Sequence, residues 1–156
     1  QWDSLRDTAL SLKGVLRAGS LQERAGPSVA VEMSLLSPTL GAEPGVGASM
    51  IGIVSQRWSA VTVHANGGLV VMRDHNLGAL GGIIVEGPFR WAIRPVVEAT
   101  IEQSEGQTAS VLAGAIWRVR DNVSFDAGWR VGRSDGAPVR DFRVGFTWGF
   151  QRGGGA

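Results

Sequence analysis

The sequence has no cysteine, no tyrosine and no long apolar run. The missing cysteine excludes disulfide bonds and thiolate metal sites. A membrane-spanning helix needs about 18 or more consecutive apolar residues, and no such stretch is present. The formal net charge is only +1, so composition gives no electrostatic reason to expect a nucleic-acid partner. With these classes excluded, the order of apolar and polar residues along the 156-residue chain is the main evidence for its fold.

The signatures of a cofactor and of a metal are also missing. Gly45 and Gly47 lack the third glycine and the following helix of a dinucleotide-binding loop. His64 and His75 do not have the spacing of metal ligands. We therefore expect neither a cofactor nor a metal site.

Glycine is the residue that the sequence has in excess. It contributes 23 of 156 residues, about twice its average share of roughly 7%. The chain has no Gly-X-Y period and only six prolines, which excludes collagen and linkers. Crowded barrel interiors and tight turns are the places that favour so much glycine.

Residues 123–150 alternate with a period of two, which indicates β-strands. One side of these predicted strands is apolar and aromatic, and the other holds small residues and charges. A soluble sandwich would bury the apolar side. A barrel in lipid would instead turn that side outward and keep the charges inside.

The same alternation recurs along the chain and predicts nine strands in one domain, residues 1–150. Eight are clear, at residues 28–36, 48–56, 61–71, 77–86, 91–102, 110–120, 123–132 and 139–150. The ninth, at residues 8–17, competes with a helix, because apolar residues in 1–17 also have helical spacing. We favour the strand. Residues 151–156 are expected to form a flexible tail.

Strand length and predicted turns both favour a membrane barrel. Most strands have about ten residues, close to the 9–11 that cross a bilayer at a tilt, whereas soluble strands average about 5–6. The predicted turns alternate between short ones, such as Asp121 and Asn122, and longer ones, such as residues 132–138. Outer-membrane barrels have short periplasmic turns and longer external loops. We therefore expect an all-β, antiparallel up-and-down transmembrane β-barrel.

Several stretches of the sequence resemble a known family. They are SPTLG at 37–41, HANG at 64–67, RPVVE at 94–98 and FRVGFTWGF at 142–150. Together they resemble the outer-membrane β-barrels of the phenol-degradation MetA-pathway family, also described as transporter barrels. The resemblance implies a bacterial outer-membrane location and passage of small hydrophobic or aromatic molecules. It also implies recognition of a terminal aromatic residue, here Phe150, by the barrel-assembly machinery.

In such a barrel the polar side of each strand would line the lumen and the apolar side would meet lipid. The predicted lumen-lining residues are Lys13, Glu32, His64, Asn66, Arg94, Glu98, Glu102, Arg118, Asp126, Arg130 and Arg143. The predicted lipid-facing and interface-girdle residues are Trp91, Trp117, Phe125, Trp129, Phe142, Phe146, Trp148 and Phe150.

The predicted lumen charges should form cross-strand ion pairs. We expect Glu98 to pair with Arg94 or Arg118, and Asp126 to pair with Arg118 or Arg143. Such charges either set the selectivity of a channel or neutralise one another in a filled interior. Eight strands favour a filled interior, and about twelve favour a channel.

An enzyme is not expected from this sequence. His64, with Thr62 and Asn66 on the same face, suggests the histidine of a barrel lipase. A hydrolase needs an activated nucleophile, and no serine lies in a matching place on this strand. We interpret His64 as a hydrogen-bonding residue of the lumen.

The sequence thus predicts a passive outer-membrane channel whose partner is the lipid bilayer. Two alternatives stay open: a non-conducting barrel that docks to proteins of a larger membrane complex, and a soluble barrel that binds a ligand. Nine strands place the chain ends on opposite sides of the membrane, although bacterial barrels have even counts. Either residues 1–17 do not span and eight strands close, or upstream strands complete a barrel of about twelve. We expect the second.

Overall fold

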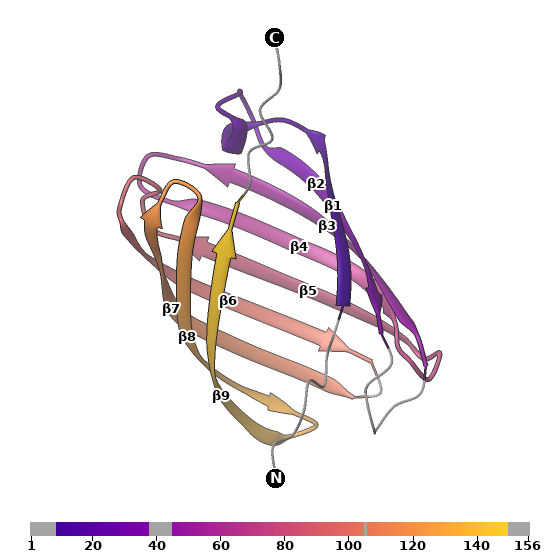
Figure 1. Cartoon of the computed structure of the whole chain (residues 1–156). Helices are drawn as coiled ribbons and strands as arrows, with labels where there is room; N and C mark the ends of the chain where they lie inside the picture. Colours follow the sequence, from indigo (N-terminus) through magenta and orange to yellow (C-terminus); the bar gives the residue numbers. More distant parts are fainter. Residues whose placement is uncertain (1–8, 38–44, 105, 150–156) are drawn as a thin grey trace.

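Nine strands form one antiparallel sheet in the computed structural model, which describes residues 9–37, 45–104 and 106–149. Figure 1 shows that the sheet is strongly curled, with β1 and β9 on the near side and the middle strands behind them. The strands are β1 Ala9–Arg17, β2 Ser28–Leu36, β3 Gly47–Arg57, β4 Thr62–Val71, β5 Leu77–Glu86, β6 Ile93–Gln103, β7 Gln107–Arg120, β8 Val123–Ser134 and β9 Ala137–Trp148.

The strands follow one another in chain order, each paired with the next. This confirms the up-and-down antiparallel arrangement that the alternation predicts. The helical interpretation of the N-terminal segment is wrong for residues 9–17, which pair with β2 from Ala9 to Arg17. Within the described part of the chain, the one helical element is the single 3₁₀ turn η1, Ser20–Gln22, between β1 and β2.

The sheet is not closed into a barrel. Its two edges are β1 and β9, which are not hydrogen-bonded to each other. The alternative prediction, a closed barrel of eight strands that leaves out the N-terminal segment, is also wrong, because β1 is a full member of the sheet. In an up-and-down sheet of nine strands the first and the last run in the same direction. A direct β1–β9 pairing would therefore be parallel, whereas every other pair is antiparallel.

The predicted alternation of short and long turns is wrong. Strands β8 and β9 extend further than the sequence suggested and meet in a turn of two residues, Asp135 and Gly136. Both have positive φ, 50° and 82°, as a two-residue hairpin turn of type I′ requires. The next connection towards the N-terminus, Asp121 and Asn122, is equally short. Turn length therefore gives no support to a membrane barrel.

The glycines of the strands explain how the sheet can curl. At Gly68 and Gly128, on the concave face, an added Cβ would come within 2.9 Å of a neighbouring strand's atoms. At Gly67 and Gly81, on the convex face, it would meet only ordinary contacts near 4 Å, and at Gly14 nothing within 4 Å. The concave side is crowded because the strands lean towards each other there. This confirms crowded interior positions as one use of the excess glycine.

The distribution of apolar side chains is the reverse of that in a soluble domain. Val70, 6% exposed, is the one buried hydrophobic residue among the described parts of the chain, whereas 29 large hydrophobic residues there are exposed. The buried polar residues are Ser28, Ser55, Thr62 and Ser110. Soluble proteins bury most of their large apolar side chains, so this sheet has no core of the usual kind.

Candidate functional site

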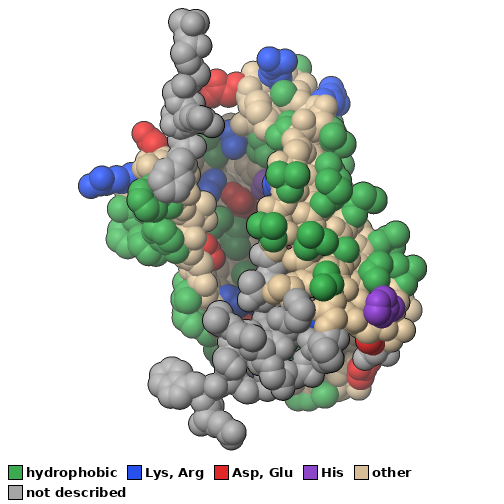
Figure 2. All heavy atoms as spheres, turned by 45° about the vertical axis from the view of Figure 1, so that its right-hand side comes forward, with side chains coloured by type: hydrophobic (Ala, Val, Ile, Leu, Met, Phe, Trp, Pro, Cys, Tyr) green, Lys and Arg blue, Asp and Glu red, His purple; other side chains and the backbone are tan. Residues whose placement is uncertain are grey.

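The polar concave face is the candidate functional site. Strand register places all eleven predicted lumen-lining residues on this one face, because residues directly opposite each other in neighbouring strands share a side. One row crosses six strands as Ser55, His64, Ile84, Glu98, Leu112 and Arg130. Figure 2 shows charged side chains inside the hollow and hydrophobic ones over the outer side of the wall.

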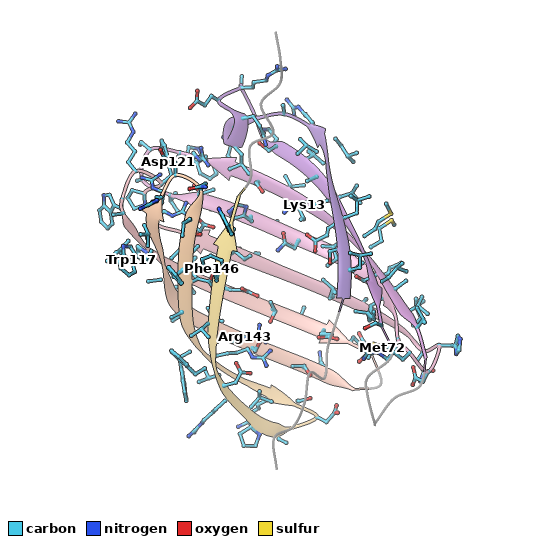
Figure 3. The ribbon with its side chains drawn as sticks, in the orientation of Figure 1. Lys13, Met72, Trp117, Asp121, Arg143 and Phe146 are labelled. Atoms are coloured by element: carbon cyan, nitrogen blue, oxygen red, sulfur yellow. The ribbon has the colours of Figure 1, made fainter. Side chains whose placement is uncertain are left out.

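The predicted lipid-facing aromatic residues lie on the convex side of the strands or in the connections between strands. All of those that the structure describes are exposed. Phe125 contacts Trp117 and Phe146, with ring centroids 6.4 and 5.1 Å apart. In Figure 3 Trp117 projects away from the sheet, whereas Arg143 lies towards the hollow. Phe150 lies outside the described residues.

Four tryptophans gather at one end of the sheet. Trp58 lies in the β3–β4 connection and Trp91 in the β5–β6 connection, while Trp117 and Trp148 lie near the ends of β7 and β9. In an antiparallel meander these four positions share one end. Each of the four side chains is more than half exposed. Exposed tryptophans grouped in this way are compatible with an aromatic belt, which in membrane proteins lies at both membrane–water interfaces.

His64 connects three strands through its two ring nitrogens. Its Nδ1 lies 2.7 Å from Ser55 Oγ on β3, and its Nε2 lies 3.4 Å from Glu86 Oε1 at the end of β5. The second carboxylate oxygen of Glu86 binds Arg94 Nη1 at 3.1 Å. Glu86 thus binds the side chains of His64 and Arg94, and the spacing of these residues in the sequence does not predict either contact. The predicted Arg94–Glu98 pair is wrong, because Glu86 takes the place of Glu98.

Ser55, His64 and Glu86 form a serine–histidine–carboxylate series. Sequence reasoning missed the serine because it lies on the neighbouring strand, and only the β3–β4 register places it opposite His64. A nucleophile must reach its substrate, yet Ser55 is only 3% exposed. The series therefore fits a hydrogen-bonded network that ties β3, β4 and β5 together better than a hydrolytic site.

A second charged cluster lies on β8 and β9. Arg130 donates to Asp141 Oδ2 through Nε at 2.7 Å and also through Nη2, and Arg143 Nε donates to Oδ1 at 3.3 Å. One carboxylate thus serves two guanidinium groups. Asp126 forms no ion pair among the described residues, so its predicted pairing with Arg118 or Arg143 is wrong. The predicted Arg118–Glu98 pair is also absent there.

A hollow of about 260 Å³ lies on the concave face beside the β8–β9 cluster. Charged residues from strands close together in the sheet line it: Glu98 and Glu102 on β6, Arg130 on β8 and Arg143 on β9. Polar residues of the middle strands complete the lining, among them Asn66, Thr100 and Ser110. Thr100 and Ser110 bind each other through their hydroxyls at 2.8 Å. The hollow thus has acidic residues on its β6 side and basic residues on its β8–β9 side, and its lining suits a small polar molecule.

No family model, curated protein or solved structure matches this chain. The resemblance to the MetA-pathway family therefore stays a prediction. No helix in the described ranges is long and apolar enough to cross a membrane. Among the residues that the structure describes, no three histidine, aspartate or glutamate side chains come together as a metal ion would require.

Proposed function

We propose that this chain forms the wall of an outer-membrane β-barrel and serves as a passive channel for small molecules. The convex face would contact lipid, and the concave face would line the path. The observation that carries the proposal is the distribution of apolar residues, with 29 large ones exposed and one buried in the described ranges. Monomeric soluble proteins rarely expose apolar patches larger than a few hundred Å².

Strand length and the four exposed tryptophans at one end of the sheet support the same proposal. Strands β6 to β9 have 11, 14, 12 and 12 residues, enough to cross a hydrocarbon layer at a tilt. Trp58, Trp91, Trp117 and Trp148 would then lie at one membrane–water interface.

Insertion into lipid requires partners for both edge strands. An unpaired edge leaves backbone N–H and C=O groups without hydrogen bonds in hydrocarbon, at a cost of several kcal/mol for each group. We propose that further strands lie between β9 and β1 in the barrel. An odd number of them makes every pair antiparallel, and three would give the barrel of about twelve that the sequence suggests.

Two measurements, made one after the other, test the proposal. Membrane extraction comes first: the protein should leave the membrane fraction only with detergent, and release by salt or alkali would indicate the soluble ligand-binding barrel instead. Planar-bilayer recording comes second: discrete conductance steps are expected. A detergent-dependent protein that never conducts would contradict the channel and favour a structural barrel that docks to other proteins.

A further inference from the structure

The β6 wall of the 260 Å³ hollow presents hydrogen-bond acceptors that lack donors. Glu98 and Glu102 have no ion pair or hydrogen bond in the described structure. Asn66 Oδ1 is buried and also has no donor there. Gly82 lies between Asn66 and Thr100 in the cross-strand row, so no side chain separates the amide from the β6 wall. Acceptors of this kind are satisfied by cationic groups with N–H donors.

The β8–β9 side of the hollow presents donors in excess. Arg130 and Arg143 share the single carboxylate of Asp141, so this cluster keeps a net positive charge. The Arg143 side chain is half exposed, which leaves its remaining N–H groups accessible. A planar guanidinium group is well suited to a carboxylate, which it can bind through two parallel hydrogen bonds.

The two walls are close enough for one small molecule. Glu98, Leu112 and Arg130 lie directly opposite one another on β6, β7 and β8. With neighbouring strands about 4.8 Å apart, the Glu98 and Arg130 backbones are separated by about 10 Å. Both side chains reach into the hollow and shorten that distance.

We propose that the hollow binds small zwitterions that carry an ammonium group and a carboxylate on one molecule. The ammonium group lies on the β6 side of the hollow, against Glu98 or Glu102, and the carboxylate lies against Arg143 and Arg130. A molecule with only one charge gains at one wall and is repelled at the other. This inference rests on the proposed function, since it names the kind of solute that a channel with this wall would select.

Calorimetric titration of the wild-type protein in detergent tests the inference directly. The probes are glycine, 4-aminobutanoate and 6-aminohexanoate, which carry the same two charges at increasing separation. The controls are their N-acetyl derivatives, which lack the cation, and their amides, which lack the anion. At least one zwitterion should bind ten-fold more tightly than both of its controls. Equal binding of a singly charged control, or no binding of any zwitterion, would overturn the proposal.

Variants assign the binding to the two walls. The double variant E98Q/E102Q and the single variant R143Q should each weaken binding of the best zwitterion at least ten-fold. E23Q, in the β1–β2 connection, is the matched control and should bind like the wild type. Circular dichroism should first show the wild-type strand content in each variant. A folded E98Q/E102Q protein that binds like the wild type would contradict the assignment.

Bilayer recording separates failure of this inference from failure of the proposed function. If the best zwitterion, added at millimolar concentration, blocks or slows the conductance of the wild-type channel, both hold. Conductance that no zwitterion changes would overturn the zwitterion site and leave the channel intact. Detergent-free solubility together with a lack of conductance would overturn the proposed function itself, whatever the calorimeter shows.

Discussion

The convex and concave faces of this sheet are built from the same strands, yet they have opposite chemistry. On β4, Gly67 faces outward beside exposed Leu69, whereas Gly68 faces inward against β3. On β6, Val97 is 49% exposed on the convex face, and its neighbours Val96 and Glu98 lie on the concave face. Period-two alternation thus gives the sheet an apolar convex surface, whose exposure to water is unfavourable, and a polar concave surface, whose exposure to lipid would be unfavourable. This difference between the faces underlies both the proposed contact with lipid and the proposed polar path.

A charge placed on the convex face should have the largest effect. Val97→Arg puts a guanidinium group near the middle of β6, where the proposed barrel meets the centre of the bilayer. We expect it to lower the free energy of unfolding in lipid vesicles by about 2–4 kcal/mol. Val96→Arg, at the same depth on the concave face, should cost clearly less. Denaturant titration followed by tryptophan fluorescence measures both. If both variants lowered the free energy of unfolding by the same small amount, the two faces would meet the same solvent.

Alanine at neighbouring glycines gives the second comparison. A Cβ at Gly68 would lie 2.9 Å from Ile51 Cα, so Gly68→Ala should lower the free energy of unfolding by about 1–3 kcal/mol. Gly67→Ala has open space and should stay within about 0.5 kcal/mol of the wild type. The same denaturant titration applies. A loss at Gly67 as large as that at Gly68 would show that curvature does not explain the crowding.

The two charged clusters of the concave face give a third comparison, between a more buried and a more exposed carboxylate. Glu86→Gln removes the carboxylate that binds both His64 and Arg94, and leaves the guanidinium group of Arg94 largely covered. We expect a loss of about 1–3 kcal/mol in the free energy of unfolding. Asp141→Asn should cost less, because its cluster is more exposed. If Asp141→Asn proved the more damaging, the His64 network would not be the main tie between strands.

The strands and their faces could be predicted from sequence because period two is a local property. Residues 123–132 and 142–148 show which side chains share a face without any knowledge of their neighbours, and the register agrees. For the same reason all eleven charged and polar residues assigned to one side do lie on one face. The outward position of the aromatic residues follows from the same pattern.

Features that depend on register or on turn geometry could not be predicted in the same way. Ser55 meets His64 only because β3 and β4 pair in one particular register. Glu86 lies opposite Thr62 and reaches both His64 and Arg94 diagonally, which a count along one strand does not reveal. The turn at Asp135 and Gly136 carries a local signal, the Asp-Gly pair that favours a two-residue hairpin turn, so the prediction of a longer loop there is wrong. Closure depends on how β1 and β9 are paired, which no local pattern encodes.

Spin labelling tests the central claim, that the convex face meets lipid and the concave face meets water, most directly. The sequence has no cysteine, so single replacements along β6 from Val96 to Ile101 give uniquely labelled proteins. In vesicles, labels at Val97, Ala99 and Ile101 should be accessible to oxygen, and labels at Val96, Glu98 and Thr100 to a water-soluble nickel complex. An accessibility period of two with this phase is the predicted result. Equal nickel accessibility at both sets of positions would contradict the account.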